Sequence, residues 1–307
     1  MPGPARKGRP VDGILLLDKP AGLSSNAALQ RARHLFNAQK AGHTGSLDPL
    51  ATGLLPVCFG EATKASAYLL DADKRYRVTV RLGRQTTTGD AEGDVLRELP
   101  VPVLECARIE HSLRRFTGQI RQVPPMHSAL KHQGRRLYEL ARAGQSVERA
   151  PRCVYVHQIR LLGVEKDLID LEVHCSKGTY VRVLAEDLAA DLGTCGHVER
   201  LRRLAVGPFR GEDMLGFERL QQLAAEGPET LDRVLLPVVA AFTGWPSAEL
   251  DADSAWYLQR GQPVQVARAP RQGLLCLYGP GRRLLGVGEV LEDGRIAPRR
   301  LLRQPPG

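Results

Sequence analysis

Apolar and polar residues alternate in ways that predict several strands. The apolar run over residues 11–17 predicts a buried strand that ends in the turn at residues 18–22. Residues 75–82 alternate with period two and place Tyr76 on the apolar face of a half-buried strand, where it lines either a cleft or the core. Residues 154–162 and 168–174 predict an antiparallel pair of strands.

Helical spacing appears between these strands. Ser24 or Ser25 can cap a helix that carries apolar residues on one side up to Phe36, and residues 62–70, 103–116, 183–192 and 211–237 also have helical character. From about residue 250, short apolar runs separated by Gly, Pro and Asp-Gly turns predict a small all-β module. The pattern therefore indicates an α+β protein with a separate C-terminal module.

Composition narrows the class of protein. The 307 residues are sufficient for more than one core, and no apolar run approaches the roughly 20 residues of a membrane span. The N-terminal ten residues lack the apolar stretch of a secretory signal. A net charge of +9 favours a polyanionic partner, nucleic acid ahead of an anionic membrane.

The six cysteines occur singly, without a CxxC pair or a His pair at zinc spacing. We therefore expect buried thiols in a reducing cytoplasm and predict no metal site. Residues 126–144 are dense in cations, which suits contact with a phosphate backbone; a solvated charged helix is the alternative.

The segment 41–64 contains the most constrained loop. Pro49 fixes its own φ and pushes Asp48 towards an extended conformation, and the surrounding glycines allow a tight turn. The loop presents either a reactive carboxylate or an ordinary cap for the segment that follows. Lys19, beside Pro20, is either a cation that contacts phosphate or a solvated one.

A partner for this carboxylate is expected in the segment 175–182. If the segment is extended, Tyr180 and Arg182 have the same parity and point the same way. A guanidinium can then hold a carboxylate and keep it ionised.

Five segments together resemble the bacterial TruB family of tRNA pseudouridine-55 synthases. They are LDKPAGLSS (17–25), GHTGSLDPLATGLLPVCFGEATK (42–64), DKRYRV (73–78), CSKGTYVR (175–182) and LRRLAVGPF (201–209). The resemblance implies a mixed, mainly antiparallel sheet flanked by helices in residues 1–245, with a basic RNA-gripping insertion at about 124–152. It implies a PUA-like RNA-binding module in residues 246–307.

The resemblance also implies roles for individual residues. Asp48 would be the catalytic aspartate, Arg182 its partner, and Tyr76 the residue that stacks on the target base. The remaining substrate contacts would come from His43, Lys19, Tyr180 and Leu201. Ser46 and Thr87 depart from the residues expected at their positions. The partner would be the T-arm stem-loop of tRNA, and we expect a cytoplasmic monomer without an obligate protein partner.

Isomerising uridine to pseudouridine imports no group and transfers no electrons to another molecule, so we expect no cofactor. The residues leave open whether Asp48 attacks C1′ or C6, or removes the 2′ proton. Two other functions remain open from the residues alone. A non-catalytic RNA-binding protein accounts for the charge, and a small-molecule hydrolase accounts for the aspartate.

Overall fold

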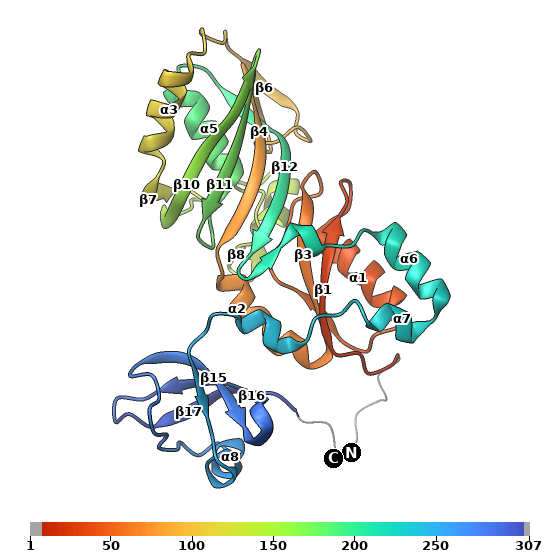
Figure 1. Cartoon of the computed structure of the whole chain (residues 1–307). Helices are drawn as coiled ribbons and strands as arrows, with labels where there is room; N and C mark the ends of the chain where they lie inside the picture. Colours follow the sequence, from red (N-terminus) through yellow and green to blue (C-terminus); the bar gives the residue numbers. More distant parts are fainter. Residues whose placement is uncertain (1–7, 304–307) are drawn as a thin grey trace.

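The computed structural model describes residues 8–303, so part of the basic N-terminal segment lies outside the described residues. The main sheet has the strand order β1-β3-β12-β4-β11-β10-β7, with β2 added to β3 and β13 added to β12 (Figure 1). Their bounds are β1 Gly13–Lys19, β2 Ala41–His43, β3 Thr52–Phe59, β4 Lys74–Leu82, β7 Gly118–Gln122, β10 Arg152–Glu165, β11 Leu168–Cys175, β12 Gly196–Val206 and β13 Phe209–Arg210.

Nearly all pairs in this sheet are antiparallel, and the short contact between β3 and β12 is parallel. The predicted alternation in β4 is confirmed for Val78, Val80 and Leu82, which are buried, and for Arg77, which is exposed. Thr79 of the polar face is also buried, because its hydroxyl bonds to Asp170 of β11. The predicted pair at 154–162 and 168–174 is also confirmed, as β10 and β11.

Helices cover the two halves of the sheet separately (Figure 1). Their bounds are α1 Ser25–Leu35, α2 Ser66–Asp71, α3 Cys106–Arg115, α4 Leu137–Arg142, α5 Val181–Asp191, α6 Phe217–Glu226 and α7 Pro228–Asp232, with 3-10 turns η1 Gly60–Lys64, η2 Gly211–Asp213 and η3 Val238–Phe242. Ser24 caps α1 by accepting the Ala27 N–H, as its position in the sequence predicted. None of the helices in the described part of the chain combines the length and hydrophobicity of a membrane span.

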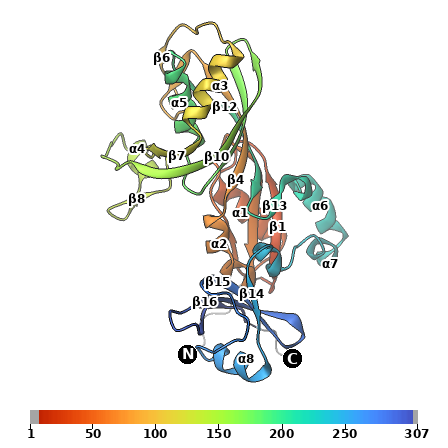
Figure 2. The same ribbon diagram turned by 60° about the vertical axis from the view of Figure 1, so that its left-hand side comes forward.

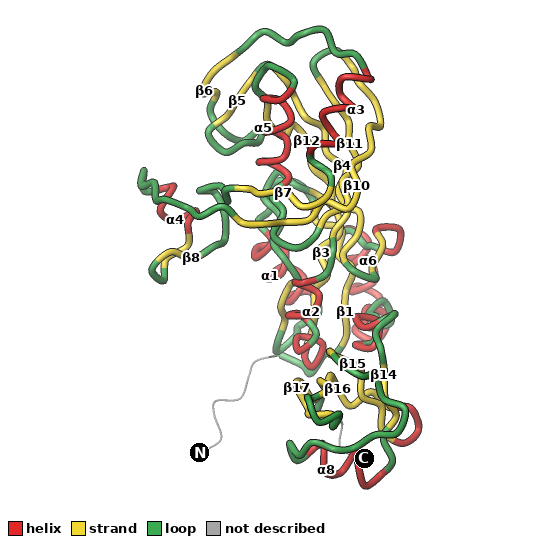
Figure 3. The backbone as a smooth tube through the Cα atoms, turned by 90° about the vertical axis from the view of Figure 1, so that its left-hand side faces the viewer, coloured by secondary structure: helices red, strands yellow, loops and turns green. Residues whose placement is uncertain are grey.

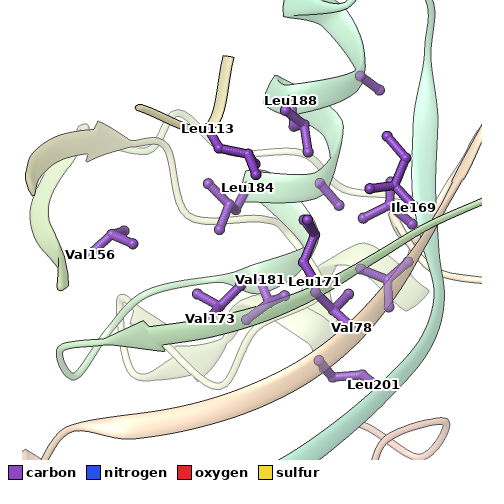
Figure 4. Close-up of a cluster of buried hydrophobic side chains, with 14 of the residues drawn as sticks. Val78, Leu113, Val156, Ile169, Leu171, Val173, Val181, Leu184, Leu188 and Leu201 are labelled. Atoms are coloured by element: carbon purple, nitrogen blue, oxygen red, sulfur yellow. The ribbon is translucent and has the colours of Figure 1, made fainter. Parts of the chain in front are cut away.

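Two large cores result. In one, α3 and α5 pack on β4, β10, β11 and β12, and Figure 4 shows Leu184 and Leu188 of α5 above Leu171 and Val78 of the sheet. In the other, α1, α6 and α7 pack on β1 and β3. The parallel contact between β3 and β12 joins the two halves, and the Asp48 loop lies next to this junction.

Two small hairpins lie outside the sheet: β5 Arg84–Thr86 with β6 Val95–Glu98, and β8 Lys131–His132 with β9 Arg135–Arg136. The second hairpin and α4 project from the body of the molecule (Figures 2 and 3). Its turn residues Gln133 and Gly134 both have positive φ, at 48° and 85°, as a two-residue hairpin requires.

The C-terminal module is built on a second sheet with the order β14-β15-β16-β17. Its elements are β14 Ser247–Glu249, α8 Ala252–Gln259, β15 Gly273–Gly279, η4 Pro280–Arg282, β16 Arg283–Val290 and β17 Ile296–Leu301. The sequence prediction of short strands did not include α8. Cys276 and Val287 of this sheet pack against Phe242 and Leu16, and Lys64 Nζ donates to the Leu301 carbonyl at 2.8 Å, so the module is docked on the rest of the chain.

Candidate active site

The loop that carries Asp48 lies between β2 and β3 and is held by buried groups on both sides of the carboxylate. Ser25 Oγ donates to the Leu47 carbonyl at 3.0 Å and accepts the Leu47 N–H at 2.7 Å. Lys19 Nζ donates to the Pro49 carbonyl at 3.2 Å. The residues before and after Asp48 are therefore both fixed to the first strand-and-helix unit.

Arg203 of β12 also holds this loop through hydrogen bonds to its backbone. It is 1% exposed, and its Nε donates to the Leu54 carbonyl at 2.7 Å while its Nη2 donates to the Gly45 carbonyl at 3.1 Å. Gly53 allows this approach: its φ is +95°, and a Cβ there would lie 2.3 Å from the Arg203 carbonyl oxygen. Glycine is thus required where β3 meets β12.

Lys19 corrects an expectation from the sequence. Its side chain is fully buried, and Nζ also donates to the carbonyls of Pro20 at 2.8 Å and Leu23 at 2.6 Å. Burial lowers the pKa of Lys19 to about 8. Lys19 is therefore neither solvated nor open to a phosphate, because the turn after β1 closes around it and its donors are used by backbone carbonyls.

Arg182 lies in a helix, whereas the sequence predicted an extended segment. Residues 176–180 form a loop, and α5 begins at Val181 with Tyr180 as its N-cap, so the strand parity assumed for Tyr180 and Arg182 does not exist. Arg182 lies in the first turn of α5, and its Nε is 3.0 Å from Asp48 Oδ2. The ion pair therefore forms from a helix instead of a strand.

Two backbone carbonyls orient the Arg182 guanidinium. Nη1 donates to the carbonyl of Thr88 at 2.7 Å, and Nη2 donates to that of His127 at 2.6 Å. The side chain is 6% exposed, whereas that of Asp48 is 39% exposed. Arg182 is thus a fixed buried cation that leaves one side of the carboxylate open.

Opposing effects act on the pKa of the Asp48 carboxyl group. Burial raises the pKa of its carboxyl group and outweighs the lowering by the Arg182 guanidinium. Asp90 raises this pKa further; its Oδ2 lies 4.0 Å from Arg182 Nε. The pair therefore does not hold the pKa below that of an ordinary aspartate, although Arg182 limits the rise.

A cavity of about 370 Å³ opens in front of Asp48. Tyr76 of β4, Leu201 of β12 and Tyr180 line it together with Arg182, so four residues predicted from three separate segments meet there. Tyr76 also packs against the core beneath, and therefore satisfies both interpretations left open by the sequence. The volume lies in the range typical of ligand sites.

The backbone of Tyr180 is fixed by Gln122 of β7. The Gln122 Oε1 accepts the Tyr180 N–H at 3.0 Å, and Nε2 donates to the Tyr180 carbonyl at 3.2 Å. Gln122 is 3% exposed, so its two hydrogen bonds position Tyr180 from inside the protein.

A second cavity of about 810 Å³ adjoins the first and shares Asp48 and Arg182 with it. His43, Arg136 and Arg142 are on its wall. Burial lowers the pKa of His43, with Arg203 and Arg136 adding to the effect, so the imidazole is neutral at pH 7. The carboxylate is therefore located where a small cavity meets a larger, cation-lined one.

The basic segment forms one wall of this second cavity. Arg136 and Arg142 lie over the Tyr138 ring, with 6.0 and 5.7 Å from each guanidinium carbon to the ring centroid. Many side chains of β8, β9 and α4 extend into solvent. The positive charge of this segment is therefore accessible to a polyanion.

The sequence matches models of one protein family along most of its length. Residues 33–181 match the TruB family pseudouridylate synthase N-terminal domain, residues 182–243 the tRNA pseudouridylate synthase B C-terminal domain, and residues 246–302 the pseudouridine synthase II TruB C-terminal model. The chain is 53% identical over 296 residues to tRNA pseudouridine synthase B of Nitrosococcus oceani, which covers 96% of each chain. This chain belongs to the TruB family. The Stutzerimonas stutzeri relative of the same name is 54% identical and covers 96% of this chain and 97% of its own.

More distant solved structures share the fold of this TruB-family chain. A chain of a Cbf5-Nop10-Gar1 complex gives a TM-score of 0.73 at 23% identity and covers 95% of this chain and 84% of its own. A chain of an H/ACA RNP bound to a substrate RNA containing 2'-deoxyuridine gives 0.74 at 20% identity, with 99% and 92% covered. At this identity the likeness concerns the fold alone.

Three residues of this TruB-family site were not selected from the sequence. Ser25 and Arg203 hold the loop, and Asp90 lies beside Arg182. Asp90 is 4% exposed, although it lies in a polar, glycine-containing segment. The Gly89 carbonyl and the Ala91 N–H bond to Val198 of β12, and this long-range pairing buries the intervening aspartate.

Proposed function

We propose that this chain isomerises the uridine at position 55 in the T-loop of tRNA to pseudouridine. The observation that carries the proposal is the position of Asp48: an open carboxylate, paired with a buried guanidinium, where a nucleotide-sized cavity meets a larger cation-lined one. Relatives more than 50% identical carry the name tRNA pseudouridine synthase B, which supplies the substrate class.

In this proposal the target nucleotide leaves its stack and enters the smaller cavity. Tyr76 stacks on the base, while Leu201 and Tyr180, which also line the cavity, contact the nucleotide. Extruding the base costs a few kcal/mol, and stacking on an aromatic ring returns roughly 1–3 kcal/mol. The remainder comes from contacts of the neighbouring RNA with the second cavity and the basic segment.

The second cavity accounts for the remaining contacts. His43 is neutral and lies on the wall of the second cavity, which places its imidazole against RNA that enters there. Lys19 acts indirectly, because it donates to Pro20 and Leu23 in the turn after β1 and to Pro49 beside Asp48, and so ties the Asp48 loop to that turn. We assign it to the positioning of Asp48.

The reaction breaks the N1–C1′ bond, turns the base, and joins C5 to C1′. C5 loses its proton and N1 gains one, so the product is an isomer and no oxidant, reductant or group donor is consumed. Attack of Asp48 on C1′, its attack on C6, and its removal of the 2′ proton all require the ionised carboxylate. Arg182 favours that form and aims it.

Tyr76 is the candidate for the final proton removal from C5, either through its hydroxyl or through a water beside it. Burial raises the pKa of this hydroxyl, with Arg203 opposing the rise, so the phenol is neutral before reaction. Its oxygen can therefore accept the C5 proton only while it passes its own proton to a neighbouring water. Tyr76→Phe keeps the stacking ring and removes the hydroxyl. A loss of turnover with unchanged tRNA affinity supports the proton-transfer role, and unchanged turnover removes it.

The proposed partner is the T-arm stem-loop, gripped by the insertion at about 124–152 and by a C-terminal RNA-binding domain over residues 246–307, with the catalytic domain in residues 1–245. We further propose that the chain acts as a cytoplasmic monomer without an obligate protein partner. Gel filtration with light scattering, alone and with a tRNA transcript, tests the monomer.

The deciding experiment incubates the protein with unmodified tRNA transcript and maps pseudouridine by carbodiimide treatment and primer extension. Wild type is expected to give one stop at position 55, and Asp48→Asn to give none while binding tRNA within a few-fold of wild type. Asp213→Asn, an exposed aspartate in η2, is the matched control and is expected to retain full activity. Substantial activity in Asp48→Asn, or a modification at another position alone, would overturn the proposal.

A further inference from the structure

Three metal-ligating side chains meet on the sheet outside the Asp48 site. They are Asp73, immediately before β4, His157 of β10 and His174 of β11. The three elements are adjacent in the sheet, since β11 pairs with both β4 and β10. The residues are separated by 84 and 17 positions in sequence, so only the strand order brings them together.

A break in strand register explains how His157 joins the other two. The pairing of β10 with β11 shifts between Val156 and Gln158, which leaves His157 as the extra residue of a bulge. A bulge re-aims the side chain that it carries. The His157 and His174 rings consequently lie 4.6 Å apart, centroid to centroid, at an interplanar angle of 35°.

The distances between the ligand atoms of Asp73, His157 and His174 are those expected of a metal site before an ion binds. His157 Nε2 is 3.0 Å and His174 Nε2 is 4.0 Å from Asp73 Oδ2, and the three ligand atoms lie within 4.8 Å of one another. Tetrahedral zinc with bonds of about 2.0–2.1 Å holds its ligand atoms about 3.3 Å apart. Rotamer adjustments within this range are sufficient to close the triad on an ion.

We propose that Asp73, His157 and His174 bind a divalent first-row transition-metal ion, Zn²⁺ in the first instance, with water in the fourth position. The inference is independent of the proposed isomerase activity. A hydrogen bond between His157 and Asp73 alone would leave His174 unexplained, because its Nε2 at 4.0 Å is too far from the carboxylate to bond directly.

The surroundings allow an ion to enter and leave. The side chains of Asp73, His157 and His174 are 46%, 34% and 27% exposed. A cavity of about 190 Å³ lies beside the triad, with Asp73 and His174 in its wall. The triad is therefore accessible from solvent without a movement of the strands.

Nearby charged groups both oppose and favour the binding of a cation at this site. Arg75 and Arg210 face it and disfavour a further cation, whereas Asp73 supplies a negative charge. The carboxylate of Asp73 therefore has to offset the repulsion that these two guanidiniums exert on a bound cation.

The test uses the full-length protein after chelation and dialysis. Zn²⁺ alone is titrated by calorimetry, and Co²⁺ alone is followed by visible absorption, which reports tetrahedral coordination. We expect one ion per chain, and a loss of affinity of about tenfold or more in each of His157→Gln and His174→Gln. His111→Gln, on the exposed side of α3, is the matched control and should bind as wild type does.

Asp73→Asn provides a third variant that preserves the shape of the site, and it should also weaken binding. Circular dichroism of each variant distinguishes a lost ligand from a lost fold. Binding that survives both triad histidine substitutions at wild-type affinity would overturn the proposal. So would a thiolate-to-cobalt charge-transfer band, since that assigns the ion to a cysteine.

Discussion

Ser25→Ala isolates the contribution of loop positioning to catalysis. The Ser25 side chain is 3% exposed and makes two hydrogen bonds with the backbone of Leu47, next to Asp48. Alanine leaves the Leu47 N–H and carbonyl unsatisfied in a buried place. Each such group costs about 1–3 kcal/mol, so we expect a loss of stability of about 2–4 kcal/mol after partial relaxation of the loop.

The effect on rate has a different origin. Without Ser25 Oγ the loop is still held by Arg203 at Gly45 and by Lys19 at Pro49, so Asp48 remains near the cavity but is less firmly aimed. A displacement of about 1 Å at a reacting group costs up to about 100-fold in rate. We therefore expect a single-turnover rate at saturating tRNA that is about 10- to 100-fold lower.

Ser112→Ala is the matched control. Ser112 is also 3% exposed, and its hydroxyl donates to Asp191 Oδ2 at 2.6 Å, between α3 and α5 and away from the cavities. This variant should lose stability while keeping the wild-type single-turnover rate. Both variants are compared by thermal unfolding and by release of tritium from C5-labelled tRNA.

Two outcomes separate the alternatives. A Ser25→Ala protein that is less stable but reacts at the wild-type rate would show that the Ser25 bonds serve folding only. Equal losses of rate in Ser25→Ala and Ser112→Ala would show that general destabilisation, and not aim, controls the rate. Either result refutes the reasoning.

Three further predictions follow from the same geometry. Burial raises the pKa of Asp48, and the reaction needs its ionised form, so single-turnover rates should fall as the pH is lowered. The midpoint of this fall should lie above the ordinary pKa of an aspartate, and a midpoint at that ordinary pKa contradicts the prediction. Gly53→Ala should destabilise the protein by more than about 3 kcal/mol in thermal unfolding, because the new Cβ would lie 2.3 Å from a backbone oxygen. Gly22→Ala is the control: its φ is +79° but the space around it is open, so it should cost only the roughly 1–2 kcal/mol of backbone strain. Arg142→Ala should weaken tRNA binding and reduce the salt dependence of log Kd by about one ion in filter-binding assays, with the rate at saturating tRNA unchanged; an unchanged salt slope would contradict phosphate contact.

The parts of the fold that the sequence predicted are those set by local pattern. The alternation in β4, the pair β10 and β11, and the Ser24 cap of α1 each depend on residues within one segment. Periodicity reports which face of an element is buried, and that information is complete within a few residues.

The features that the sequence did not predict depend on contacts between distant segments. Lys19, beside Pro20, was expected either to contact phosphate or to be solvated, but three carbonyls from the turn and from Pro49 enclose it. The triad of Asp73, His157 and His174 has no sequence spacing typical of a metal site, since strand order and a bulge create it. Neither arrangement leaves a signal in any one segment.

Arg182 shows how a correct pairing can arise from an incorrect local structure. The sequence predicts Tyr180 and Arg182 on one face of a strand, whereas Tyr180 is the extended N-cap of α5 and Arg182 is the second residue of that helix. The alternation of a strand therefore does not relate the two side chains. Both line the smaller cavity, but of the two only Arg182 also lines the larger cavity and reaches Asp48 at the boundary between them. From the helix its guanidinium also bonds the Thr88 and His127 carbonyls, which joins their two segments to the carboxylate.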